Sequence, residues 1–178
     1  MEESKADLLR HWLRLRKTLV DRTMLPWRHP SFVLYFVVAV VLVGGSGLWL
    51  ELHKLIFPET AAPQSLGALR TALITFFPAL AGSSCMQVIL EENDDRALRA
   101  MAVCMLIVLS ALALAIAPSS VSTCAALPIG LVGVWLALWT WWIANAKQPG
   151  FQDERPDAAV GKRDPKSGLS GTLEGFTA

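Results

Sequence analysis

The chain has 178 residues, of which 53% are hydrophobic and 17% are charged, and its formal net charge is +1. Because a soluble domain carries about 25% charged residues, this composition predicts an integral membrane protein. A net charge so close to zero gives no support for general nucleic-acid binding, and we expect no nucleic-acid partner.

Residues 1–30 are predicted to form a basic amphipathic helix followed by a Pro-Trp linker. Apolar residues recur at helical spacing through Trp12, Leu15 and Leu19, while basic side chains occupy the other side. A helix of this kind is suited to the lipid headgroup plane; docking of its apolar face on a partner helix is the alternative. The expected membrane-surface residues are Arg10, Trp12, Arg14, Lys17 and Trp27.

The first predicted span is 31–50, a run of uncharged residues long enough to cross the hydrocarbon core. Gly44, Gly45 and Gly47 lie near its far end. They predict either a patch of close helix packing or a local weakening of the helix. A polar connection, 51–70, follows this span.

The central span, 71–90, is uncharged but contains a proline and several small polar residues. In a membrane helix a proline kinks the chain more often than it breaks it, because neighbouring groups satisfy the freed carbonyl. Thr75, one turn before Pro78, is a candidate for that role. Small residues permit close helix approach, so this span predicts either a packing seam, which is the commoner case, or a pore lining. The candidate residues are Thr71, Thr75, Pro78, Gly82, Ser83, Ser84, Gln87 and Glu91.

The remaining predicted spans are 100–117 and 129–146, joined to the central span by an acidic turn. This turn holds four acids between Glu91 and Asp95 but lacks the alternating acids and central glycine of a calcium loop. A solvated turn explains it better. We therefore expect no metal site and no cofactor.

Residues 147–178 are polar and rich in proline and glycine, and we expect a disordered cytosolic tail. In a four-span topology, fourteen of the sixteen Lys and Arg residues lie on one side of the membrane. Only Lys54 and Arg70 lie on the other. The positive-inside rule then places both termini in the cytosol, and we expect a multi-pass protein of the plasma membrane, specifically a bacterial inner membrane.

The expected fold is all-α, an integral membrane bundle of four transmembrane helices within 31–146. Because every charged residue falls outside the four spans, the sequence argues against a proton-driven transporter. No catalytic set is evident, so an enzyme is not expected. The leading hypothesis is a non-enzymatic subunit of a membrane complex, or a pore-like assembly, formed by self-association or with another membrane protein. The alternatives are a facilitator of an uncharged solute and an interfacial enzyme that uses the cluster Glu91–Asp95.

Overall fold

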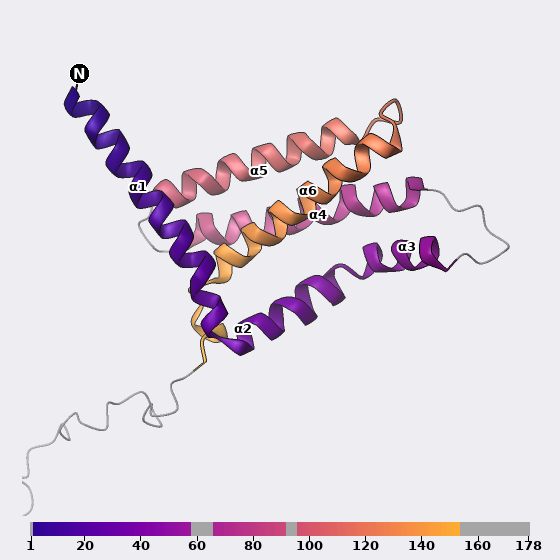
Figure 1. Cartoon of the computed structure of the whole chain (residues 1–178), viewed down its shortest axis with the longest axis horizontal. Helices are drawn as coiled ribbons and strands as arrows, with labels where there is room; N and C mark the ends of the chain where they lie inside the picture. Colours follow the sequence, from indigo (N-terminus) through magenta and orange to yellow (C-terminus); the bar gives the residue numbers. More distant parts are fainter. Residues whose placement is uncertain (1, 58–65, 92–95, 154–178) are drawn as a thin grey trace, which may run out of the picture.

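The computed structural model describes residues 2–57, 66–91 and 96–153, with side chains from Arg10 onward. Within these ranges every regular element is helical, which confirms the all-α prediction for this part of the chain. The N-terminal helix, α1 (Glu2–Met24), crosses one end of the other helices (Figure 1). We call this end of the molecule the α1 end.

Three helices are long and apolar enough to cross a membrane: α4 (Leu66–Leu90), α5 (Arg96–Ile116) and α6 (Thr123–Asn145). A fourth is added if the segments 10–28 and 30–44, which meet at 93°, count as one broken span. The three helices begin earlier in the chain than the expected spans 71–90, 100–117 and 129–146. Arg70 and Pro128 therefore lie inside helices rather than in connections.

Glycines bring α6 close to α4. A Cβ atom added to Gly133 would lie 3.1 Å from the ring of Phe77, and one added to Gly130 would lie 3.1 Å from the side chain of Leu73. This approach fills the space between α4, α5 and α6 with side chains that are fully buried, among them Phe77, Ala81, Leu109 and Ala137. The centre of a single chain is therefore a packed core.

The expected span 31–50 is divided among several elements. They are α2 (Pro30–Tyr35), the π-helical η2 (Phe36–Gly44) and α3 (Ser46–Ile56), and η1 (Leu25–Arg28) precedes them. Pro26 and Pro30 lie at the bend, as the sequence predicted, because proline favours helix starts and disfavours helix interiors. We refer to residues 30–56 as the first span.

The first span breaks at Gly45. A Cβ atom there would collide with the backbone oxygen of Val41, so only glycine fits this turn without a backbone shift. The indole Nε1–H of Trp49 donates to the same Val41 oxygen at 2.9 Å, which supplies a partner for a carbonyl at the break. Of the two interpretations of the glycines, local weakening of the helix applies at Gly45.

Prolines inside α4 and α6 do not end these helices. The hydroxyl of Thr75 donates to the backbone oxygens of Thr71 and Ala72, at 3.0 and 3.1 Å, and not to Ile74, whose carbonyl Pro78 leaves without its helical donor. The expectation that Thr75 serves the freed carbonyl is therefore not met.

The chain after α6 returns to the α1 end. The short helix η3 (Pro149–Phe151) places the Phe151 ring 4.5 Å from Tyr35 and 5.9 Å from Phe32, measured between ring centroids. Residues 147–153 thus pack against the first span instead of belonging to a free tail. The rest of the expected tail, 154–178, lies outside the described residues.

Candidate functional site

A buried ion pair joins α1 to the far end of α4. The side chain of Arg22 is 2% exposed, and that of Glu91 is 27% exposed. The Arg22 Nη2 donates to both Glu91 carboxylate oxygens at 3.1 and 3.2 Å, while Nη1 donates to Oε2 at 3.2 Å and to the backbone oxygen of Ile143 at 3.4 Å. Charge-assisted, forked contacts of this kind are stronger and more directional than neutral hydrogen bonds. They fix the position of α1 on α4 and α6.

Further polar contacts surround this pair. The Asn145 Nδ2 donates to the side-chain oxygen of Gln87 at 3.0 Å, which links α6 to α4. The Arg99 Nη2 donates to the backbone oxygen of Glu91 at 2.7 Å, so α5 covers a carbonyl at the end of α4. We refer to Arg22, Gln87, Glu91, Arg99 and Asn145 as the polar cluster. Its contacts hold four helices together at the α1 end.

The polar cluster is a structural joint between helix ends. Its one carboxylate, Glu91, already accepts from Arg22, and residues 92–95 of the expected acidic turn lie outside the described residues. Across the described ranges, no group of three or more His, Cys, Asp or Glu side chains could hold a metal ion. The described geometry therefore supports positioning of helices at this site.

A different face of α4 carries a row of small side chains that the other described residues leave exposed. The row repeats every fourth residue, and all its members are exposed: Gly67, Thr71, Thr75, Ala79 and Ser83. We call this row the small-residue ridge. Residues four apart form the shallow i±4 ridges of a helix, along which another helix packs. The opposite face of α4, with Leu73 and Phe77, is buried against α6 and α5.

The candidate residues of the central span fall into two groups. Thr71, Thr75 and Ser83 belong to the small-residue ridge; Pro78 and Gly82 lie beside it, and a Cβ atom on Gly82 would meet nothing within 4 Å. Ser84, Gln87 and Glu91 lie elsewhere: Ser84 is fully buried and donates to the Leu80 oxygen at 2.7 Å, and the other two belong to the polar cluster. The structure therefore does not join all eight candidates into one lining.

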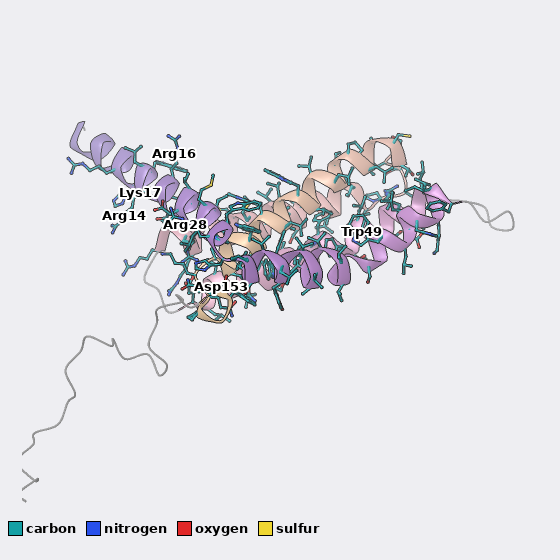
Figure 2. All side chains as sticks on the ribbon, turned by 60° about the horizontal axis from the view of Figure 1, so that its bottom comes forward. Arg14, Arg16, Lys17, Arg28, Trp49 and Asp153 are labelled. Atoms are coloured by element: carbon teal, nitrogen blue, oxygen red, sulfur yellow. The ribbon has the colours of Figure 1, made fainter. Side chains whose placement is uncertain are left out.

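The five expected membrane-surface residues are all exposed. Trp12 is 63% exposed and Trp27 is 65% exposed, and Arg10, Arg14 and Lys17 are also exposed. Figure 2 shows Arg14, Arg16 and Lys17 along α1 and Arg28 near the bend, all projecting from the outer part of the molecule. Among the α1 side chains from Arg10 onward, those around Arg22 pack most deeply against the bundle.

Sequence reasoning missed two arginines that the structure places among helix ends. The Arg70 guanidinium donates to the backbone oxygen of Ile116 at 3.0 Å through Nε, to that of Val121 at 3.0 Å, and to that of Pro118. It therefore caps the end of α5 and holds the connection to α6. For Arg22 one signal was available, since it follows Leu15 by seven residues and so lies on the bundle-facing side of α1.

The Asp153 carboxylate contributes to the contact between residues 147–153 and the first span. The backbone N–H of Ser31 donates to Asp153 Oδ2 at 3.3 Å, and the backbone N–H of Asp153 donates to Nδ1 of His29 at 3.2 Å. Hydrogen bonding from Ser31 lowers the pKa of Asp153, and the nearby His29 adds a smaller effect in the same direction. The described end of the chain is thus tied to the start of α2.

An apolar cavity of about 400 Å³ separates the first span from α4 and α6. Its walls come from the break at Gly45 and Trp49 and from aliphatic residues such as Leu73 and Leu131. Because water needs two or more polar partners in such a site, this cavity does not offer a route for polar solutes.

Comparisons with protein-family models, with curated proteins and with solved structures found no match. The function is therefore argued from the geometry alone.

Proposed function

We propose that this chain is a non-enzymatic subunit of a membrane complex that forms by self-association through the small-residue ridge of α4. The supporting observation is the contrast between the two sides of α4. Leu73, Phe77 and Val88 are buried in the bundle, while Thr71, Thr75, Ala79 and Ser83 are exposed in a single chain. A lone helix in lipid gains nothing from an exposed row of small residues, whereas a helix pair gains close backbone approach.

The hydroxyl groups of the ridge suit this role. The Thr71 hydroxyl donates to the Gly67 oxygen at 3.0 Å, and the Ser83 hydroxyl donates to the Leu80 oxygen at 2.9 Å. Because these hydroxyl donors are satisfied within their own helix, they need no acceptor from another chain when a second helix packs on the ridge. Rows of small residues four apart favour right-handed helix crossings near about −40°. We expect two copies of α4 to cross in this way.

A pore between copies is the second candidate. The core between α4, α5 and α6 is filled, so a pore would have to run between chains. The hydroxyls of Thr71, Thr75 and Ser83 lie on one face of α4, so a ring of copies with this face inward would line its axis with polar groups. Flux through liposomes that contain the protein, abolished by Gly82→Leu, would support this candidate; flux unchanged by that substitution would remove it.

The proposed complex lies in a cell membrane with the α1 end on the cytosolic side. The distribution of Lys and Arg supports this orientation. The angle of 93° between segments 10–28 and 30–44 is also what a helix in the headgroup plane requires when the next segment enters the bilayer.

Cross-linking between copies tests the proposal. With Cys104 and Cys124 replaced by serine, and the buried Cys85 retained, single cysteines are introduced along the ridge at positions 71, 75, 79 and 83 and on α5 at positions 107 and 111. We expect oxidation in membranes to link two chains at the ridge positions. Positions 107 and 111 are matched controls because both are exposed on another helix. Equal linking at both sets, or none at the ridge, would reject the proposal.

A further inference from the structure

Three separate faces run along α1. Residues Leu15, Thr18, Leu19 and Arg22, at helical spacing, face the bundle and are half-buried or buried. A second face is apolar but exposed, with exposed fractions of 61% for Leu13, 49% for Val20 and 61% for Met24. The third face carries Arg10, Arg14, Lys17 and Asp21, while Arg16 lies on the other side of the apolar face. An exposed apolar face beside a charged one is typical of a helix that lies half over the bundle and half over lipid.

The charges exposed along α1 and η1 are predominantly positive. Between residues 10 and 28 the exposed basic side chains are Arg10, Arg14, Arg16, Lys17 and Arg28, and Asp21 is the one exposed acid. Arg22 does not contribute to this surface because Glu91 neutralises it within the bundle. This surface therefore attracts anions, and lipid headgroups of the same leaflet are the anions that lie next to it.

Below the bend, an open groove of about 650 Å³ descends along the first span. Trp27, Pro30 and Ser31 form its upper part, and Val33, Leu34 and Val37 form its lower part. Leu34 is 67% exposed and Val37 is 43% exposed, so no described part of the chain covers the lower part. Arg28 lies next to Trp27 in the sequence, and Figure 2 shows it near the bend.

We propose that the bend between α1 and the first span binds an anionic phospholipid, with one acyl chain in this groove and Arg28 as the cation that contacts the phosphate, while the basic side chains further along α1 attract neighbouring anionic headgroups. A free anion would contact the cations but not the apolar groove, and an uncharged hydrocarbon would occupy the groove without contacting the cations. The two features together fit an amphipathic anion. Asp153 lies beside Ser31 at the mouth of the groove. Its negative charge is outweighed by the five exposed cations of residues 10–28.

Lipid retention by the full-length protein tests this proposal. The purified protein is delipidated in detergent and offered phosphatidylglycerol or phosphatidylcholine with identical chains, and bound lipid is counted by native mass spectrometry. We expect phosphatidylglycerol to bind more tightly. Because each cation near an anionic surface contributes ~1 kcal/mol, equivalent to about fivefold in affinity, Arg28→Gln should weaken phosphatidylglycerol binding about fivefold. Arg14→Gln with Lys17→Gln, at positions 11 or more residues from Arg28 and so roughly 16 Å or more away, should weaken it less than Arg28→Gln does.

Two control variants distinguish the contribution of the cations to lipid binding from that of the groove. Lys147→Gln removes an exposed cation outside α1 and should leave lipid binding unchanged. Val37→Trp fills the lower groove and should weaken binding of both lipids, and the thermal midpoint of each variant shows that the fold is retained. Equal binding of the two lipids, or equal effects of Arg28→Gln and Lys147→Gln, would overturn the proposal. The proposal would also fail if glycerol phosphate competed for the site as effectively as the whole lipid does. Unchanged lipid binding by Val37→Trp would contradict it as well.

Discussion

Removing either partner of the Arg22–Glu91 pair should have unequal effects. Glu91→Leu leaves the Arg22 guanidinium, which is 2% exposed, buried without a counter-charge, and this should cost about 3 kcal/mol of unfolding free energy. Arg22→Met leaves a carboxylate that is already 27% exposed and can be hydrated. We expect that variant to lose only about 1 kcal/mol.

The double variant Arg22→Met with Glu91→Leu removes both charges and keeps apolar volume at the joint. Because replacement of a buried ion pair by apolar side chains is often close to neutral, it should lie within about 1 kcal/mol of the wild type. The four proteins form a double-mutant cycle with an expected coupling of roughly 3–5 kcal/mol. The assay is reversible unfolding in mixed micelles, followed by the signal of the buried tryptophans.

The chain offers a matched control for this cycle in the pair Lys54–Glu51. Its nitrogen and oxygen are 2.7 Å apart, closer than in the buried pair, but the Lys54 side chain is 66% exposed. An exposed pair at this spacing should show a coupling of about 0.5 kcal/mol or less. If the Arg22–Glu91 coupling were no larger than that of the control, burial would not determine the strength of the joint, and the reasoning would fail.

Three further predictions concern other contacts. Gly133→Ala places a methyl group 3.1 Å from the Phe77 ring and should lower stability by about 1–3 kcal/mol, measured as a drop in thermal midpoint. Arg70→Ala leaves the carbonyls at the end of α5 without their partner, and hydrogen exchange across 117–122 should become faster than in the wild type. The pKa of Asp153 is lowered in the fold, so its contact with Ser31 stabilises the fold at pH values above the ordinary aspartate pKa of about 3.9. This stabilisation is lost as the pH falls through the lowered pKa. The Ser31 amide chemical shift should follow this loss, and Asp153→Asn should show no such titration.

Much of the helical architecture follows from runs of uncharged residues, because a chain in hydrocarbon must satisfy its backbone within helices. The break at Gly45 does not follow from such a run. It depends on how the Val41 carbonyl finds a donor, and that donor is the side chain of Trp49, eight residues away. Composition indicates which segments enter the membrane, but not where a helix changes its hydrogen-bond pattern.

The candidate site was predicted only in part, for a related reason. The sequence grouped Thr71 and Thr75 with Ser84 as candidates, yet Ser84 is fully buried while the two threonines are exposed. Spacing says which residues share a face, but the neighbouring helices decide which face is covered. The Arg22–Glu91 pair was missed because its partners are 69 positions apart and each looks like an ordinary interfacial charge.

Counting chains per complex in a lipid bilayer tests self-association through the small-residue ridge most directly. The protein is labelled once per chain, reconstituted at low density, and counted by stepwise photobleaching. Ala79→Leu places a bulky side chain in the middle of the ridge, and Ala111→Leu makes the same change at an exposed position of α5. The proposal predicts multimers for the wild type and for Ala111→Leu, and single chains for Ala79→Leu. Single chains for all three proteins, or multimers that persist in Ala79→Leu, would contradict it.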